Sequence, residues 1–248
     1  NKHINSDKIN TFGKIKYKNL LKSDEKPNVI IFSHCFFDAP HNEGIHLFAD
    51  YFEWVEYLGK LSNETDYNWY LKKHPHSVEK KLNSDVIDYF IKKYPKINLL
   101  PTDTNNNEIL SNKVDLILTV GGSVGYEYSY YGIPVIMAGD KMSYENYDIG
   151  YQAKNLEQYN YSIKNFSKLR FSYNKEEICR YYYNLYLAKY DLLKNYFLHR
   201  EKYGKSFFDD TIFKIWMNEF NIDHEKKKVS EINNFITKKQ SNLVAKLI

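Results

Sequence analysis

Short apolar runs alternate with amphipathic segments through residues 27–140. Runs rich in Val, Ile, Leu and aromatic residues, each with the length of a buried strand, occur at 29–33, 68–71, 97–100, 114–120 and 133–138. Between them, apolar residues recur at helical spacing over 45–61, 86–94 and 107–111, and another short helix is expected between Ser123 and Gly132. This alternation predicts an α/β fold in which right-handed crossovers join a parallel sheet of about five strands.

The two flanks of this region have a different pattern. Residues 1–26 show no clear periodicity and are expected to be a lead-in or an interdomain linker. Residues 27–151 form the predicted sheet domain, and 152–248 form a predicted loop-rich and helical C-terminal region. The segment 139–174 is dense in Tyr and Asn and predicts loops, whereas 178–196, 212–220 and 232–236 predict helices.

A glycine-rich turn, GGSVGYE, follows the run at 114–120 and lies where open parallel sheets place their ligands. Gly121 and Gly122 turn the chain, and Ser123 begins a short helix whose free N–H groups suit a phosphate. Glu127 lies one helical turn further on the same face, where a carboxylate can accept hydrogen bonds from sugar hydroxyls. Helix capping is the alternative, but a capping box has its acid three residues after the cap, at Tyr126 here. Capping therefore accounts for Ser123 and not for Glu127, which favours a ligand site.

A second candidate is the sequence KKHPH, which closes the run at 68–71 and lies at the same edge of the predicted sheet. Pro75 disfavours a helical conformation at His74, so the imidazole is held in extended chain at the strand end. There His74 can donate to a phosphate oxygen, and Lys72 can add positive charge. A plain surface loop and a metal pair of His74 with His76 are the alternatives, and the metal pair lacks an evident third ligand.

The loop after the first predicted strand adds further polar groups to this edge. It contains His34, Asp38, His41 and Glu43. Metal binding, substrate contact and an ordinary solvated loop all fit these residues. The topology favours contact with substrate or with an interdomain cleft for His34 and Asp38, and a solvated loop for His41.

Composition excludes several classes of protein. The net charge is +4, and the lysines are mixed with acids along the chain, so no nucleic-acid surface is expected. The two cysteines, Cys35 and Cys179, form no disulfide framework, which favours a reducing cytoplasm. No apolar run approaches the ~20 residues of a membrane span, and the first residues lack the apolar core of a signal peptide. Attraction to an anionic membrane surface stays open.

These residues resemble the capsule and surface polysaccharide glycosyltransferases of bacteria, including relatives that transfer Kdo or sialic acid from CMP-activated donors. The likeness covers about residues 27–151 and follows the order VIIFSH, FADYFEWVEYL, NWYLKKHPHS and LTVGGSVGYEYSYYGIPVIMAG. In that family, the K-x-HP and G-S/T-x-x-x-E…G-x-PVI motifs lie in the C-terminal half of a GT-B fold and bind the nucleotide part of the sugar donor. The matching residues here are Lys72, His74, Pro75, Gly122, Ser123, Glu127, Gly132 and Pro134, and Tyr144 with Gly150 and Tyr151 resemble the family's next loop.

The resemblance implies that 27–151 is a Rossmann-like, nucleotide-sugar-binding domain, and that this chain is the donor-binding half of a GT-B glycosyltransferase. The donor would be a nucleotide-sugar, with a CMP-sugar such as CMP-Kdo favoured, and the acceptor a glycan or glycolipid. Catalysis would depend on His74, which stabilises charge on the leaving group, and on Glu127, which anchors the ribose. No cofactor or metal is expected, because a CMP leaving group carries one phosphate. Such an enzyme is expected in the cytoplasm, with peripheral association at the inner membrane as an option.

Other classes share part of this pattern. The pairing of HP with a later glutamate also occurs in UDP-sugar 2-epimerases and in teichoic-acid-type glycerophosphotransferases. An epimerase-like isomerase, a glycerophosphotransferase and a non-catalytic nucleotide-sugar-binding module are therefore the alternatives. KKHPH also departs from the commoner K-P-H-P. The family's catalytic base usually lies on the other half of the enzyme, so no base is assigned to this chain.

Overall fold

The computed structural model describes residues 13–36, 47–74, 81–139 and 147–182, with the single positions 214, 226 and 230. The chain divides into two compact units, Asn1–Ile178 and Cys179–Ile248. The first unit contains the sheet and the candidate site. No helix among the described residues is long and apolar enough to cross a membrane.

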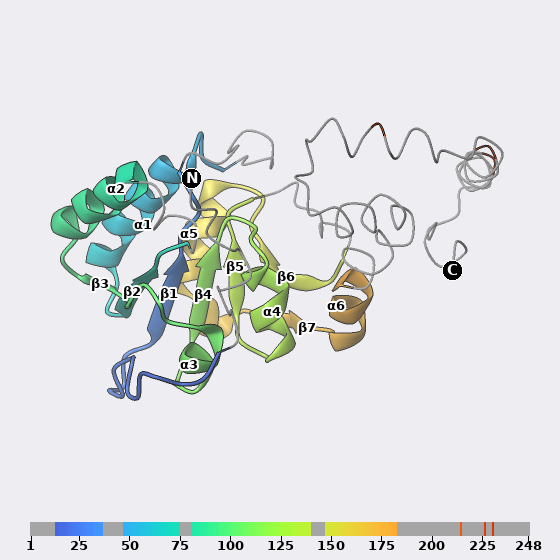
Figure 1. Cartoon of the computed structure of the whole chain (residues 1–248), viewed down its shortest axis with the longest axis horizontal. Helices are drawn as coiled ribbons and strands as arrows, with labels where there is room; N and C mark the ends of the chain where they lie inside the picture. The colour runs from blue at the N-terminus through green and yellow to red at the C-terminus, as the bar shows by residue number, and fades with distance from the viewer. Residues whose placement is uncertain are drawn as a thin grey trace. The chain divides into compact units, whose positions relative to one another are not determined.

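Seven strands of the described chain form one sheet in the order β3-β2-β1-β4-β5-β6-β7 (Figure 1). The strands are β1 (Asn28–Phe32), β2 (Asn68–Lys72), β3 (Ile97–Leu99), β4 (Leu116–Thr119), β5 (Val135–Met137), β6 (Ile149–Gln152) and β7 (Ser172–Tyr173). All neighbours pair in parallel except β6 and β7, which pair antiparallel. A mostly parallel sheet in this order, with helices between its strands, is consistent with a Rossmann-like α/β fold.

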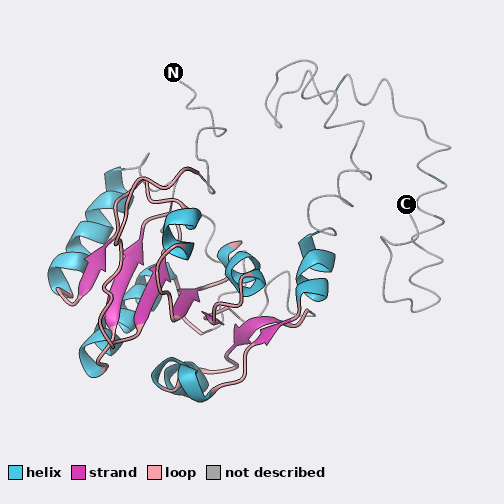
Figure 2. Cartoon of the chain, turned by 90° about the horizontal axis from the view of Figure 1, so that it is seen from below, coloured by secondary structure: helices cyan, strands magenta, loops and turns pink. Residues whose placement is uncertain are grey.

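Helices lie on both sides of the strands (Figure 2). They are α1 (Tyr51–Glu64), α2 (Lys81–Lys93), α3 (Asn106–Leu110), α4 (Val124–Tyr130), α5 (Leu156–Lys164), the 3-10 helix η3 (Phe166–Lys168) and α6 (Lys175–Tyr182). On one face of the sheet, Trp54 of α1, Phe90 of α2 and Tyr159 of α5 share a fully buried core with the strands. On the other face, Tyr128 of α4 packs on the ring of Phe32, 5.2 Å between centroids.

The strands over 27–140 confirm the sequence prediction in number and direction. All five predicted runs form strands, and these pair in parallel. The runs are apolar on both faces because the strands are covered on both sides, and β1, β2, β4 and β5 are buried at every residue.

The first helix begins later than its periodicity predicts. The predicted helix spans 45–61, whereas α1 begins at Tyr51. Asp50 ends the preceding loop because its side chain accepts a hydrogen bond from the N–H of Glu53 (2.7 Å), and Glu53 accepts one in return from the N–H of Ala49 (2.6 Å). This reciprocal cap places the helix start. Residues 45 and 46 lie outside the described residues.

The segment 139–174, expected to be loop-rich, contains four elements that its composition did not predict, namely β6, α5, η3 and β7. Strand β6 extends the parallel sheet beyond β5, and α5 packs on the same sheet. Gly150 of β6 has φ +62°, and a Cβ there would lie 2.8 Å from Met137 Cε, so only glycine fits. The predicted helix over 178–196 overlaps α6 at its start. The rest of it, and the helices predicted at 212–220 and 232–236, lie outside the described residues.

Part of the expected lead-in is a strap, residues 13–22, tied to α3 and β2. The backbone N–H groups of Lys16 and Tyr17 donate to Glu108 Oε1 (2.6 and 3.0 Å). Further along, the N–H of Leu21 donates to Asn112 Oδ1 (3.3 Å) and that of Lys22 to the hydroxyl of Tyr70 (2.8 Å). Glu108 is fully buried, and these donors satisfy it.

Candidate functional site

The candidate site lies at the carboxyl edge of the sheet, where the strand order changes direction. From β1 the chain passes to β2 and β3 on one side, and then returns to place β4 on the other side of β1. Open α/β sheets bind their ligands in the crevice at such a switch point. The segments that follow β1, β2 and β4 contain His34, Lys73 with His74, and Gly121 to Ser123.

His34 reaches across the switch point from β1 to β4. Its Nε2 lies 3.3 Å from the hydroxyl oxygen of Thr119, which also accepts the N–H of Gly122 (3.3 Å). A Cβ at Gly122 would lie 3.6 Å from His34 Cε1, so the glycine backbone closely approaches the imidazole. The ring stacks on Tyr51 (4.5 Å) and meets the edge of Trp54 (6.1 Å). The sequence predicted the position of His34 and Gly122, but not Thr119.

His34 is neutral at physiological pH. Burial lowers the pKa of His34 from 6.5 to about 3, and the nearby charge of His74 acts in the same direction. The imidazole can therefore serve as a hydrogen-bonding group and not as a cation. Positive charge for an anionic ligand has to come from another residue.

Lys72 supplies such a charge. It is the last residue of β2 and only 9% exposed. Its ammonium lies 5.7 Å from the ring centroid of Phe32, its register partner on β1. Burial lowers the pKa of Lys72, while the charge of Glu127 raises it in part. Among the described residues, none forms a hydrogen bond or ion pair with this ammonium, which interacts instead with the Phe32 ring and with the charge of Glu127.

Glu127 has partners that the sequence did not reveal. Asn106 Nδ2 donates to Glu127 Oε2 (2.9 Å), and Ser123 bonds to the same carboxylate. Burial raises the pKa of Glu127 above its usual value, and the bonds from Ser123 and Asn106 and the charge of Lys72 offset part of that rise. The alternative in which Ser123 caps α4 is wrong, because its side chain makes no capping hydrogen bond.

The strand ends that carry Lys72 and His74 are fixed to β1 through Ser33. The N–H of His74 donates to Ser33 Oγ (3.2 Å), and Ser33 donates through both its N–H and its hydroxyl to the carbonyl of Lys72 (3.1 Å each). Ser33 is buried. It therefore holds His74 beside His34 at the carboxyl edge, as the sequence predicted for the histidine's position.

Several predicted residues cannot be placed at the site. Asp38, Pro75 and Tyr144 lie outside the described residues, as do His41, Glu43 and His76. Gly150 and Tyr151 lie in β6, where Tyr151 meets the ring of Phe171 (6.1 Å). The metal alternative has no support in the described part of the chain, where no group of three His, Cys, Asp or Glu residues could hold an ion.

Two contacting residues, Asn106 and Thr119, were missed from sequence. Asn106 stands in a run of three asparagines, and only its partner distinguishes it from its neighbours. Thr119 ends an apolar strand, and a β-branched residue there is expected for packing alone. No sequence signal distinguishes either one.

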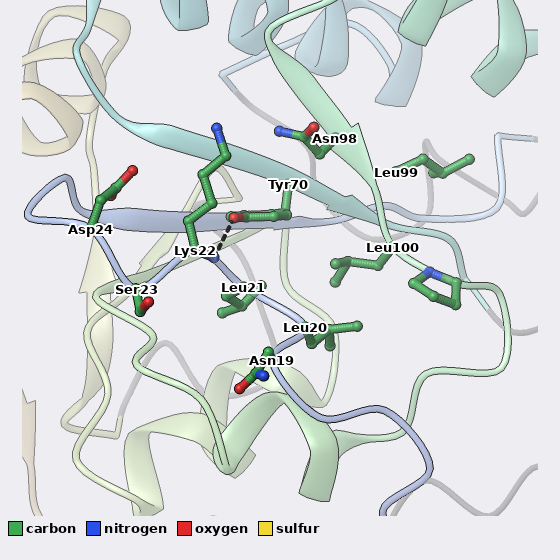
Figure 3. Close-up of a pocket in the computed structure, with 11 residues that line it drawn as sticks. Asn19, Leu20, Leu21, Lys22, Ser23, Asp24, Tyr70, Asn98, Leu99 and Leu100 are labelled. Atoms are coloured by element: carbon green, nitrogen blue, oxygen red, sulfur yellow. Dashed lines mark hydrogen bonds between the residues drawn. The ribbon is translucent and has the colours of Figure 1, made fainter.

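A separate hollow of about 600 Å³ lies between the strap and the strands β2 and β3 (Figure 3). Its lining includes Leu20, Tyr70, Asn98 and Leu100, and the hydroxyl of Tyr70 accepts the N–H of Lys22 within it. None of the predicted site residues lines this hollow. It is therefore distinct from the candidate site.

No protein-family model matches this chain, and no curated protein or solved structure matches it either. The fold class rests on the sheet itself, and the candidate site rests on the contacts of its residues. The likeness to capsule glycosyltransferases stays an expectation from sequence motifs.

Proposed function

We propose that the carboxyl edge of this sheet binds a nucleotide-activated sugar, and that the chain is a glycosyltransferase of capsular or surface polysaccharide synthesis. The donor favoured is a CMP-sugar such as CMP-Kdo, and the acceptor a glycan or glycolipid. The observation that carries the proposal is Lys72, a residue only 9% exposed, whose ammonium contacts the ring of Phe32 and forms no hydrogen bond or ion pair with a described residue. A largely desolvated charge is costly without a close counter-charge, and an anionic ligand would supply one.

The phosphate of the donor would lie between the ends of β1, β2 and β4. Lys72 would meet its charge, and His74 would donate from the strand end fixed by Ser33. In a site with few waters, such fixed charges stabilise a developing anion more strongly than in solution. As the bond to the sugar breaks, negative charge grows on the nucleotide, and these two groups would stabilise it.

The ribose would be held by Glu127. A carboxylate offers about four lone-pair positions, and Asn106 and Ser123 each take one of them. A ribose hydroxyl would donate to one of the positions that remain. The neutral His34, held by Thr119, would line the neighbouring wall of the crevice.

A metal or cofactor is not part of the proposal. A CMP leaving group carries a single phosphate, and one buried lysine with an imidazole can balance it. The proposal also extends to the architecture of the whole enzyme. This sheet would be the donor-binding half of a GT-B enzyme, with the catalytic base on a second domain and the enzyme at the cytoplasmic face of the inner membrane.

A thermal-shift comparison of CMP, CDP, UDP and GDP with the full chain tests this proposal. A ligand that binds only the folded state raises the melting temperature as ln(1+[L]/Kd) grows. We expect CMP to raise it with that dependence, and Lys72→Met to abolish the shift. A shift with UDP and none with CMP would favour an epimerase-like isomerase, and no shift with any of the four would contradict nucleotide binding.

A further inference from the structure

Glu127 is held in place by a residue from a distant segment of the chain. Its Oε2 accepts from Asn106 Nδ2 at 2.9 Å across 21 positions of sequence. Asn106 is the first residue of α3 and only 2% exposed. A buried amide that donates to a half-buried carboxylate restrains both side chains, because the amide has no water as a ready substitute and its bond is to a charged group.

Asn106 differs from the asparagines on either side of it. Asn105 donates to the carbonyl of Lys14 (3.0 Å), and Asn107 to the carbonyl of Gly13 (2.9 Å). Those two bonds tie α3 to the strap. Asn106 alone of the three donates toward the candidate site, so the run combines two structural anchors with one contact to Glu127.

The turn that presents Asn106 is itself rigidly supported. Asn105 and Glu108 form a complete capping box at the start of α3. The Glu108 carboxylate accepts the backbone N–H groups of Asn105, Lys16 and Tyr17. The strap thus fixes the end of α3, and α3 fixes the amide that meets Glu127.

We infer that Asn106 is a positioning residue that orients the Glu127 carboxylate, leaving its remaining lone pairs available to a ligand hydroxyl. The inference rests on the proposed role of Glu127 as ribose anchor. Without the amide, the carboxylate keeps only the bond to Ser123 and can turn toward Lys72, so the ligand meets a group that is less well fixed. The bond also supports the charged form of Glu127, because a donated hydrogen bond stabilises a carboxylate against burial.

The experiment compares Asn106→Ala with Asn107→Ala in the full chain. Both substitutions remove one amide bond from the same helix, but only the first removes a contact with Glu127. Calorimetric titration with cytidine should show a loss of about tenfold in affinity for Asn106→Ala, as expected for one bond to a charged group. Asn107→Ala should bind as the parent does. If Asn106→Ala does not fold, Asn106→Ser, which keeps a small polar side chain, takes its place.

A second readout does not need a ligand. The Glu127 carboxyl can be titrated by NMR in chain carrying ¹³C-labelled glutamate, with Glu127→Gln to assign its signal. We expect Asn106→Ala to move the midpoint to higher pH, because a donor to the charged form is lost, and Asn107→Ala to leave it unchanged. Equal midpoints in all three proteins would overturn the inference, and so would equal affinity losses for the two alanine variants.

The same experiment separates this inference from the proposed function. If Glu127→Gln binds cytidine as tightly as the parent, or if the parent binds none, the proposed role of Glu127 as ribose anchor is refuted. The carboxyl titration then still decides whether Asn106 holds Glu127. If Glu127→Gln loses affinity and Asn106→Ala does not, the ribose role stands and the positioning role is refuted.

Discussion

Acidification should destabilise the fold through one residue, His34. Its imidazole is enclosed by Tyr51, Trp54 and Thr119, and burial lowers its pKa from 6.5 to about 3. As the pH falls below 6.5, the unfolded chain takes up a proton at this residue and the folded chain does not. The stability that neutral His34 confers is therefore complete above that pH and declines as the pH falls toward 3.

The magnitude follows from the two pKa values. One pKa unit corresponds to about 1.4 kcal/mol, so the free energy of unfolding should fall by about 2 kcal/mol between pH 7 and pH 5 from this residue alone. This loss is a substantial share of the free energy of unfolding of a domain of ordinary stability.

The assay compares the parent with His34→Gln, which keeps a hydrogen-bonding side chain and removes the titration. Urea unfolding followed by fluorescence of the buried Trp54 and Trp69 gives the free energy at pH 7, 6 and 5. Titrating groups other than His34 and its neighbours contribute equally to the free energy of unfolding of both proteins, so their contributions cancel in the difference. We expect the parent to lose about 2 kcal/mol more than the variant over this range. A difference that stays constant with pH would show that His34 titrates normally and is not enclosed as described.

Four further substitutions test other parts of the structure. Lys72→Met should keep or raise the free energy of unfolding, because it removes a largely buried cation that forms no hydrogen bond or ion pair with a described residue, while calorimetry should show weaker binding of CMP and unchanged binding of cytidine. Glu127→Gln should gain stability relative to the parent between pH 4 and pH 7 in urea unfolding, because the raised pKa of Glu127 makes its ionisation costly in the folded state. Gly59→Ala would place a Cβ in steric overlap with the ring of Tyr94 and should lower the free energy of unfolding by about 1–3 kcal/mol. Gly132→Ala meets no atom within 4 Å and should cost only the strain of its positive φ, about 1 kcal/mol.

The strands were predictable because the sheet is covered on both faces. The runs from 29–33 to 133–138 are mostly apolar and lack the regular apolar–polar alternation of a strand exposed on one face. The start of α1 was not predictable from periodicity, because apolar residues continue before the cap at Asp50. Strand β6 escaped prediction because it is mostly half-buried and its sequence, IGYQ, has little apolar character.

The site was predictable only as far as topology determines it. Parallel strands bring their carboxyl ends together, so the positions of His34, His74 and Gly122 followed from the strand order. The contact of Asn106 with Glu127 depends on how the loop after β3 folds back, and that of His34 with Thr119 spans 85 positions. Such pairings arise from tertiary packing, and the local sequence contains no pattern that specifies them.

The central claim is that this edge binds a nucleotide through separate contacts to its phosphate and its ribose. Calorimetric titration of the full chain with CMP and with cytidine, at one salt concentration, tests both contacts together. His74→Ala is compared with Glu127→Gln. His76→Ala, two residues later in the sequence, is the matched imidazole control.

The account predicts that His74→Ala weakens CMP binding and leaves cytidine binding unchanged, because only the nucleotide carries the phosphate. Glu127→Gln should weaken both ligands equally, by about 1–3 kcal/mol, since both contain the ribose. His76→Ala should bind both as the parent does. Equal losses of CMP and cytidine in His74→Ala, or a larger loss in His76→Ala, would contradict the claim.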